Sequence, residues 1–361
     1  MRNKLFLIPL ALLLAISLVA IGCPATPTTT PPATTPSTTT PPTTSPPPEE
    51  VFHWRIQGPG PESDAAMFIS LAALEQIIEE ASEGRVQVDV YCDGVLCARP
   101  ETVDAVKHGA IEAASWMGAY GVTAAPSALL TEIPFGASDV YEDIALHQDW
   151  GLTEVMREEY VPAGIYLLSN QYAGDIAFHS TFPVNTADDL NGKLVWVIPT
   201  FSWMTDFGAV PTEVPGFDVY TAMKLGTIEG HTWPLPGLRE YNMVETSKYV
   251  MIPALCSANL HVGVNMDAWN ALGPDLQQKI QSRVDADWPA AWIQVYDREQ
   301  EIVQEAKDAG VQFITLPPAE LDRMKAAAKS YWDQVAAMSP ACAEGVEIYK
   351  NYMASIGKPI P

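Results

Sequence analysis

Side chains that could carry chemistry are scattered through this sequence and form no recognised catalytic pattern. The histidines are His53, His108, His147, His179, His231 and His261. No two of them stand at the i, i+4 spacing by which a helix presents a pair of ligands to zinc. A nucleophile elbow, a phosphate-binding loop and a dinucleotide fingerprint are also missing. We therefore expect no catalytic residue, no metal site and no cofactor.

The cysteines divide into Cys23, close to the N-terminus, and four in the body of the chain. Cys92 and Cys97 flank the turn sequence DGVL, which is short enough to bring their side chains together, while Cys256 and Cys342 are the remaining pair. An even number of cysteines in an exported chain is compatible with disulfides, so both pairs are disulfide candidates. A zinc site is disfavoured because neither pair has the C-x-x-C spacing.

The first 23 residues have the composition of a secretory signal. Arg2 and Lys4 precede an apolar run over residues 5–21, and small residues lead up to Cys23. That order is typical of export signals, and the residues before Cys23 resemble a bacterial lipobox, in which the cysteine becomes lipidated after cleavage. A plain signal peptide or a single membrane anchor would show a similar pattern. Each alternative puts the bulk of the chain outside the cytoplasm, and lipidation would also anchor it to the membrane.

Composition separates a tether from the rest of the chain and excludes some partners. Residues 24–50 consist almost entirely of Pro, Thr, Ala and Ser, so they are expected to form an extended, disordered tether. The formal net charge of the whole chain is −24 at pH 7. This excess of acidic residues argues against a nucleic-acid partner and against adhesion to an anionic membrane surface.

Beyond the tether, strands and helices are predicted to alternate as in a mostly parallel α/β sheet. VFHWRIQ is typical of an alternating strand, residues 64–82 carry apolar side chains at helical spacing, and GRVQVDVYCDG is a second strand. A similar series begins near Gly174, so the remaining chain of about 310 residues is expected to form two lobes with a cleft between them. A long helical stretch is expected from Pro274 to about Ala309, with a kink at Pro289.

Seven phrases cover the folded region in the order and spacing of one known family. They are EGRVQVDVYCDGVL, PETVDAVKHGAIEAA, LTEIPF, TADDLNGKLVWV, FGAVPTEVPGFDVYTAMKLGTIEGHTWP, VNMDAWNALGPDLQQKI and AKDAGVQFITLPPAELDRM. The chain resembles the solute-binding subunits of tripartite ATP-independent periplasmic (TRAP) transporters, of the DctP type. The resemblance is most specific in DVYTAMKLGTIEG, where family members have an acidic residue, Val-Tyr, a helix and Gly-x-x-Asp-Gly.

The resemblance implies a two-lobed periplasmic-binding-protein-like fold with hinge strands and a long helix that spans both lobes. Lobe I would comprise residues 51–175 and about 262–300, and lobe II residues 176–261 and about 301–361. The lobes would close on a small organic solute and deliver it to the membrane subunits of an ion-driven TRAP permease. The rival interpretation is an extracellular enzyme or ligand-sensing domain on the same scaffold.

Three positions that usually hold polar contacts to a carboxylate differ from the family pattern. The main arginine of the family is replaced by Trp196, in GKLVWV. A second arginine is often found where this chain has Ile176. The third position is the Asn of the family phrase G-Q-E-N-P, which is Trp233 here, with His231 and Thr232 in place of the Gln and Glu. A carboxylate in a closed cleft without a cationic partner would be unfavourable by several kcal/mol. Simple dicarboxylates, sialic acid-like sugars and small 2-oxo acids are therefore disfavoured.

Trp196 is expected to face the cleft. Alternation along GKLVWVIP places Trp196 on one side of the strand and Val195 and Val197 on the other. Together with Trp233, this indole could stack a planar or apolar solute, or hold a cation against the ring faces. The alternative is that both indoles only fill the cleft. Further candidates for the cleft wall are Trp54, Gln57, Trp116, Tyr120 and Trp203.

Overall fold

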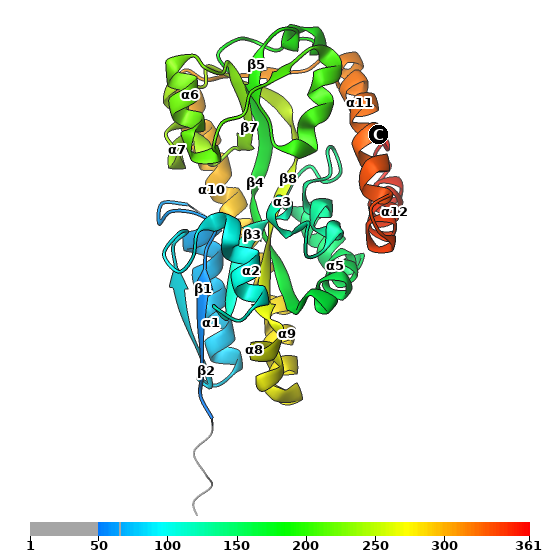
Figure 1. Cartoon of the computed structure of the whole chain (residues 1–361). Coiled ribbons are helices and arrows are strands. Elements are labelled where there is room, and N and C mark those ends of the chain that lie inside the picture. Colours follow the sequence, from blue (N-terminus) through cyan, green and yellow to red (C-terminus); the bar gives the residue numbers. More distant parts are fainter. Residues whose placement is uncertain (1–49, 65) are drawn as a thin grey trace, which may run out of the picture. The chain divides into compact units, whose positions relative to one another are not determined.

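The structure is a computed structural model that describes residues 50–361 with the exception of Ala65. The predicted signal sequence, the lipidation of Cys23 and the tether as far as residue 49 lie outside the described residues. Within the described chain, strands and helices alternate in the α/β manner that the sequence predicted (Figure 1).

One mixed sheet organises the described chain. Its strands are β1 (Phe52–Gln57), β2 (Val86–Tyr91), β3 (Ala113–Met117), β4 (Ile165–Ser180), β5 (Leu194–Trp196), β6 (Val210–Pro211), β7 (Gly230–Pro234), β8 (Tyr249–Asn265) and β9 (Gln312–Thr315). Their order is β2-β1-β3-β8-β4-β7-β5-β6, and β9 pairs with β8. β1 runs parallel to β2 and β3, and β5 runs parallel to β6 and β7. We call the part built on β1–β3 lobe I and the part built on β5–β7 lobe II.

Two long strands, β4 and β8, cross between the lobes. They pair with each other in antiparallel orientation, and β8 also pairs with β3 toward one end and with β9 toward the other. The register slips between Tyr172 and Gly174. Gly174 has a φ of 109°, and a β-carbon at this position would lie 2.6 Å from Cδ of Pro236. Glycine is therefore required where the crossing strands bend.

Helices connect the strands and cover the sheet. The α-helices are α1 (Ala72–Ala81), α2 (Thr102–Lys107), α3 (Gly118–Gly121), α4 (Val140–Ile144), α5 (Leu152–Tyr160), α6 (Val219–Leu225), α7 (Gly237–Glu240), α8 (Met266–Ala271), α9 (Gly273–Asp287), α10 (Pro289–Asp308), α11 (Pro318–Ala336) and α12 (Pro340–Ser355). The shorter 3-10 and π segments are η1 (Ala66–Leu71), η2 (Arg99–Glu101), η3 (Pro126–Glu132), η4 (Ala145–Asp149), η5 (Val161–Ala163), η6 (Ala187–Leu190), η7 (Pro199–Phe207), η8 (Gly216–Asp218) and η9 (Met243–Glu245).

The helix α10 contacts both lobes. It begins at Pro289, directly after α9 and Trp288, so the predicted interruption of the long helical stretch at Pro289 is confirmed. Proline suits the first position of a helix, where its missing N–H is not needed. α10 packs against η1 of lobe I and α7 of lobe II. At the C-terminal end of the chain, α11 packs on η7, and α12 packs on α5 and η3. The residue bounds of the two lobes stay a prediction.

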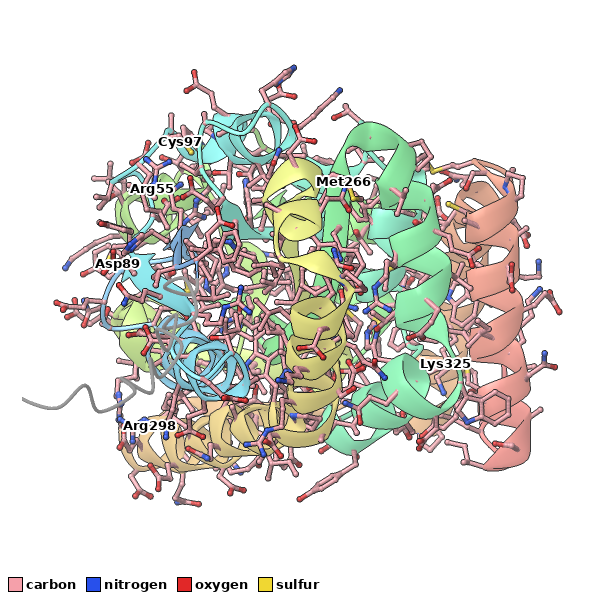
Figure 2. All side chains as sticks on the ribbon, turned by 90° about the horizontal axis from the view of Figure 1, so that it is seen from below. Arg55, Asp89, Cys97, Met266, Arg298 and Lys325 are labelled. Atoms are coloured by element: carbon pink, nitrogen blue, oxygen red, sulfur yellow. The ribbon has the colours of Figure 1, made fainter. Side chains whose placement is uncertain are left out.

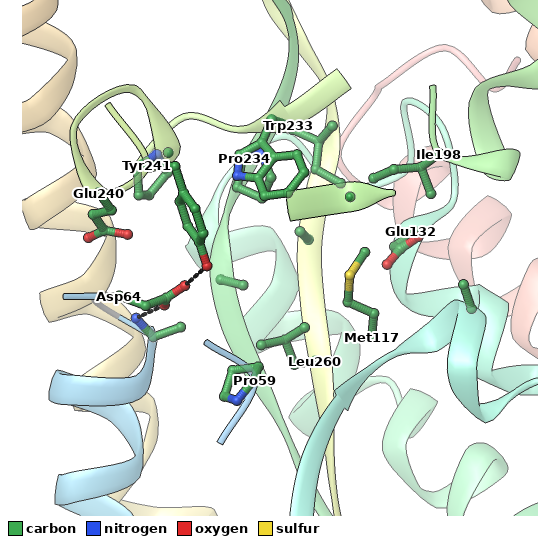
Figure 3. Close-up of a pocket in the computed structure, with 18 of the residues that line it drawn as sticks. Pro59, Asp64, Met117, Glu132, Ile198, Trp233, Pro234, Glu240, Tyr241 and Leu260 are labelled. Carbon is green, nitrogen blue, oxygen red and sulfur yellow. Dashed lines mark hydrogen bonds between the residues drawn. The ribbon is translucent and has the colours of Figure 1, made fainter. Parts of the chain in front are cut away.

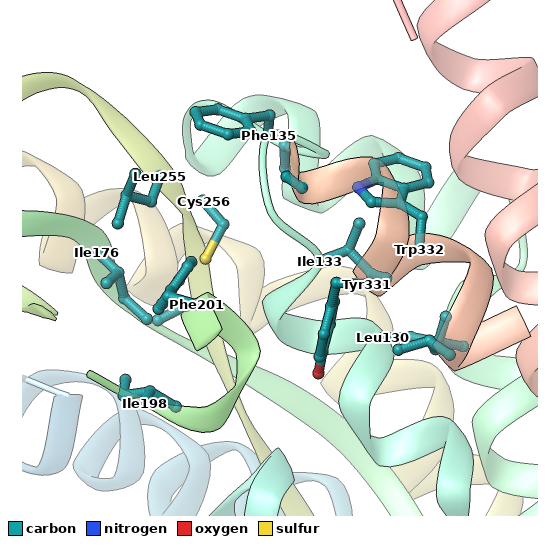
Figure 4. Packing of buried hydrophobic residues seen from close by; sticks show 14 of the residues in the cluster. Leu130, Ile133, Phe135, Ile176, Ile198, Phe201, Leu255, Cys256, Tyr331 and Trp332 are labelled. Atoms are coloured by element: carbon teal, nitrogen blue, oxygen red, sulfur yellow. The ribbon is translucent and has the colours of Figure 1, made fainter. Parts of the chain in front are cut away.

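Apolar side chains from distant segments pack together beneath the C-terminal helices. Phe135, Phe201, Cys256 and Trp332 belong to one such cluster (Figure 4), and the Trp332 indole N–H donates to the carbonyl of Pro134 at 2.8 Å. Charged side chains such as those labelled in Figure 2 project from the periphery of the fold. Burial of this cluster stabilises the packing of η3, η7 and α11, and η3 and η7 each contribute a residue to the wall of the cavity described below.

All four cysteines of the described chain are free thiols, which corrects the expectation of Cys92–Cys97 and Cys256–Cys342 bridges. Cys97 instead contacts Gln57, whose Nε2 donates to the Cys97 carbonyl at 3.1 Å and lies 3.4 Å from its sulfur. Cys256 and Cys342 are buried among apolar side chains, and burial raises the pKa of the Cys256 thiol. The two inner cysteines therefore behave as small apolar residues of the core.

Candidate functional site

A cavity of about 280 Å³ lies between the two lobes and above the bend of the crossing strands. Pro59 and Met117 border it from lobe I, and Trp233 and Pro234 border it from lobe II (Figure 3). Leu260 of β8 forms part of its floor. Because both lobes and the crossing strands contribute to the wall, any movement of the lobes about the bend changes the size of this cavity.

Aromatic rings form the lobe II side of the cavity. The ring centroids of Trp196 and Trp233 are 5.7 Å apart with 41° between their planes, and Trp233 meets Tyr241 edge-on at 5.3 Å. The Trp196 indole N–H donates to the carbonyl of Val214 at 2.8 Å, which fixes the orientation of the ring. Val195, on the opposite side of β5, is fully buried.

A hydrogen bond joins the two lobes at one end of the cavity. The Tyr241 hydroxyl donates to Oδ2 of Asp64 at 2.9 Å, and Oδ1 of Asp64 accepts from the backbone N–H of Ala66 at 3.0 Å (Figure 3). Burial and the Asp64 carboxylate raise the pKa of the Tyr241 hydroxyl above its usual value, so it stays a donor. This contact links segments 177 residues apart in sequence.

Two further charged residues border the cavity, Arg99 of η2 and Glu240 of α7. The Arg99 guanidinium donates to Oδ2 of Asp93 at 3.0 Å and to the carbonyl of Pro59 at 2.5 Å. The basic side chain of this wall is therefore already engaged by acceptors of the protein. Glu240 lies on the same side as the Asp64–Tyr241 contact in Figure 3.

A buried carboxyl group, that of Glu132, lies on the cavity wall away from this contact (Figure 3). Glu132 is the last residue of η3, which ends there because Ile133 precedes Pro134 and adopts an extended conformation. Its side chain is 1% exposed and accepts a hydrogen bond from the Thr200 hydroxyl at 3.4 Å. Burial raises the pKa of the Glu132 carboxyl to about 7, and the Thr200 contact offsets this only in part.

Four of the residues proposed from the sequence lie together on this wall: Trp196, Trp233, Ile176 and Tyr120. Trp196 and Trp233 come from lobe II, Ile176 from the crossing strand β4, and Tyr120 from α3 of lobe I. Their contact with a solute stays a prediction.

Two proposed tryptophans lie inside the lobes and away from the cavity wall. Trp54 is 2% exposed and packs against Trp269, with ring centroids 6.4 Å apart. Trp203 packs against Phe135 at 5.7 Å. The sequence pattern of a strand or helix shows which of its faces is apolar. It does not show whether that face packs against another element or lines the cavity, because the neighbouring element comes from a distant part of the chain.

Three other proposed residues are also set back from the cavity. Gln57 accepts from the backbone N–H groups of Leu96 and Cys97, and the Trp116 indole N–H lies 3.3 Å from the Tyr160 hydroxyl. His231 is fully buried and stacks on His179 at 4.9 Å. Burial, with His179 nearby, lowers the pKa of His231, so both rings are neutral near pH 7.

The polar residues of the cavity were not singled out in the sequence. Glu132 stands within LTEIPF, Asp64 precedes the first helix, and Tyr241 follows α7. For Glu132 there was a signal, namely a single carboxylate in a mostly apolar stretch, two residues before Pro134. Nothing in the sequence alone could have paired Asp64 with Tyr241, because their meeting depends on how the lobes pack.

The described residues offer neither a metal-binding cluster nor a membrane-spanning helix. No group of three or more His, Cys, Asp or Glu side chains within residues 50–361, Ala65 apart, is arranged to hold a metal ion. In the same part of the chain, no helix is both long and apolar enough to cross a membrane.

Two α/β lobes joined by crossing strands, with a cavity between them, define the class of two-lobed solute-binding proteins. Residues 61–338 match the family described as bacterial extracellular solute-binding protein, family 7 (DctP). This match covers well over half of the chain, and the chain belongs to that family. The resemblance to TRAP solute-binding subunits and the two-lobed fold class inferred from the sequence are thereby confirmed.

Curated relatives are distant in sequence. A monocarboxylate 2-oxoacid-binding periplasmic protein of Nostoc sp. is 24% identical over 231 residues, which cover 62% of this chain and 63% of that protein. The 2,3-diketo-L-gulonate-binding periplasmic protein YiaO of Escherichia coli is 23% identical over 263 residues, covering 71% of this chain and 77% of YiaO. The match with the Nostoc protein thus spans slightly less than two thirds of that relative. Both relatives are named as binding proteins rather than enzymes.

Solved structures share the fold. A TRAP periplasmic solute-binding protein from Desulfovibrio salexigens with bound orotic acid has a TM-score of 0.76 at 19% identity, covering 84% of this chain and 99% of the other. Another, from Chromohalobacter salexigens with bound (S)-(+)-2-amino-1-propanol, has a TM-score of 0.70 at 23% identity, covering 85% and 97%. At these identities the likeness concerns the fold alone.

Proposed function

We propose that this protein captures a small organic solute in the cavity between its lobes and delivers it to the membrane subunits of a TRAP permease. The observation that carries the proposal is the cavity itself, which is bordered by both lobes and lined largely by aromatic and aliphatic side chains. Such concave, mostly apolar sites with a few convergent polar groups are typical of small-molecule binding.

The solute is proposed not to be a simple dicarboxylate. The family positions that usually hold a clamp arginine are Trp196 and Ile176 here, and both border the cavity. Arg99 does border it, but its guanidinium is held by Asp93 and the Pro59 carbonyl. Relatives named for 2-oxoacids, for 2,3-diketo-L-gulonate and for ectoine indicate that membership of the family leaves the solute open.

The proposal is tested by a thermal-shift screen of the purified protein with anionic, neutral and cationic organic libraries kept separate. A ligand present at one hundred times its dissociation constant should stabilise the protein by about 2.7 kcal/mol. Trp150→Ala, which alters an exposed tryptophan outside the cavity, should respond like the parent, whereas Trp196→Ala should lose the shift. Chemical turnover of the stabilising compound would contradict the proposal and favour an enzyme.

We further propose that the chain is exported and held at the membrane by lipid on Cys23, as the lipobox-like residues before it suggest. Cys23→Ala should move the protein from the membrane fraction to the soluble extracytoplasmic fraction. A variant that stays in the membrane without cleavage would identify residues 5–21 as an anchor instead.

A further inference from the structure

The Glu132 carboxyl group has few partners within the described chain. Its hydrogen bond from the Thr200 hydroxyl is 3.4 Å long, at the weak end of the range for such bonds. Its side chain is 1% exposed, and Figure 3 shows the carboxyl group beside Met117 at the cavity wall. A buried carboxylate is unfavourable unless a cation or several donors reach it. A partner for Glu132 can approach from the cavity.

The rest of the wall near Glu132 offers apolar and aromatic surface. Met117, Ile198 and Leu260 line the same cavity in Figure 3, and the Trp196 and Trp233 rings lie on the lobe II side. Indole faces carry partial negative charge and attract organic cations, most strongly where water is excluded. An apolar group that bears positive charge would therefore meet favourable surroundings on both its charged and its uncharged sides.

The charge balance of the cavity points in the same direction. Asp64, Glu132 and Glu240 supply carboxyl groups to the wall, and Arg99 supplies the basic side chain. Arg99 already donates to Asp93 and to a backbone carbonyl. Once Glu132 is ionised, an anionic solute beside it would meet a like charge at a buried position, which is unfavourable.

Resting on the proposed function, we propose that the solute is an organic cation, with an ammonium-type group that pairs with the Glu132 carboxylate and an apolar body that lies against Trp196 and Trp233. Glu132 is then the residue that selects for charge. The two indoles select for shape and contribute cation–π attraction.

The pH dependence of binding follows from the groups that face Glu132. Thr200 does not titrate, and burial together with Glu132 raises the pKa values of Cys256 and of Tyr331, whose hydroxyl lies 3.2 Å from that of Thr200. These groups therefore stay neutral between pH 5.5 and 8. Glu132, whose pKa burial raises to about 7, must lose its proton before it can pair with a cation. A cation of fixed charge should bind more tightly as pH rises through this range.

The test uses three probes that share a benzene ring and differ in the charge of the attached group: benzyltrimethylammonium, benzyl alcohol and benzoate. Their dissociation constants for the purified protein are measured by calorimetry at pH 5.5 and pH 8. We expect benzyltrimethylammonium to bind at least about tenfold more tightly than benzoate at pH 8. We also expect its affinity, and not that of benzyl alcohol, to fall at pH 5.5.

Glu132→Gln keeps the size of the side chain and removes its charge. In this variant the affinity for benzyltrimethylammonium should fall by about tenfold or more, and its dependence on pH should disappear. Glu347→Gln, which removes the same charge from an exposed position on α12, is the matched control and should bind like the parent. A fall of equal size in both variants would assign the effect to net charge and would overturn the role of Glu132.

The other outcomes separate this inference from the proposed function. Benzoate or benzyl alcohol binding as tightly as the cation, with no change in Glu132→Gln, would overturn the inference and leave a solute-binding protein of another specificity. No binding by benzyltrimethylammonium or by any member of the cationic library would also overturn it. The proposed function fails only if the anionic and neutral libraries give no ligand either.

Discussion

Two buried acidic regions of this protein differ in how many hydrogen bonds their carboxyl groups accept. At the bend of the crossing strands, Oε2 of Glu299 accepts from the Asp175 backbone N–H at 2.7 Å. Oδ1 of Asp175 accepts from the hydroxyls of Ser257 at 2.7 Å and Tyr172 at 3.1 Å. On the cavity wall, Glu132 has only the long contact from Thr200 within the described chain.

This difference distinguishes buried carboxyl groups that stabilise the fold from one that is available to a bound solute. Burial raises the pKa of both Asp175 and Glu299, and both carboxyl groups accept hydrogen bonds from neighbouring groups of the protein. Such a network holds the strands in one arrangement. Glu132 has a similar burial and pKa without comparable partners, and its environment is completed by whatever enters the cavity.

We expect the largest loss of stability when a tryptophan that packs beside the bend of the crossing strands is replaced. Trp292 of α10 is 1% exposed and packs with Tyr172 and Val295, so Trp292→Ala should lower the free energy of unfolding by about 3–5 kcal/mol. Urea denaturation measures this change. Trp150→Ala, at an exposed position, should lower the free energy of unfolding far less. Equal losses in the two variants would contradict the placement of Trp292 in the core.

Glu132→Gln should change stability with pH. Burial raises the pKa of Glu132 to about 7 in the folded state, whereas its pKa in the unfolded chain is about 4.3. The parent therefore loses about 3–4 kcal/mol of stability in total as the pH rises from about 4.3 to about 7. The variant lacks this loss, so it should be more stable than the parent at pH 8 and similar to it at pH 4. Denaturation at both values tests the sign, and a constant difference would mean that Glu132 does not titrate in this range.

Trp196→Ala should affect affinity more than stability. Trp196 is only partly buried and lines the cavity, so we expect a loss of about 2 kcal/mol or less in unfolding free energy. Affinity for the solute found by screening should fall in the same variant. Heavy destabilisation with unchanged affinity would place Trp196 among the core residues, beside Trp54 and Trp203.

The smallest effect is expected for the contact between the lobes. Tyr241→Phe removes the hydrogen bond to Asp64 and leaves the ring in place, which should cost about 1 kcal/mol. Because this bond joins the lobes, the rate of solute release should rise in stopped-flow measurements. An unchanged release rate would show that the contact does not limit opening.

Local chemistry allowed much of the fold to be predicted from the sequence. Alternating strands, the proline that interrupts the long helix at position 289 and the ordered family phrases led to the two-lobed α/β class. The same reasoning proposed Trp196, Trp233, Ile176 and Tyr120, which line the cavity. These predictions rest on periodicity and on short motifs, which depend on residues close together in the chain.

Tertiary structure alone decided which side chains reach the cavity. Trp203, a further candidate, packs inward on Phe135, and His231 stacks on His179 although it belongs to the same family phrase as Trp233. Conversely, Glu132 lines the cavity because η3, η7 and the crossing strands meet around it. Burial and pKa depend on neighbours from distant segments, and the sequence by itself does not state which segments become neighbours.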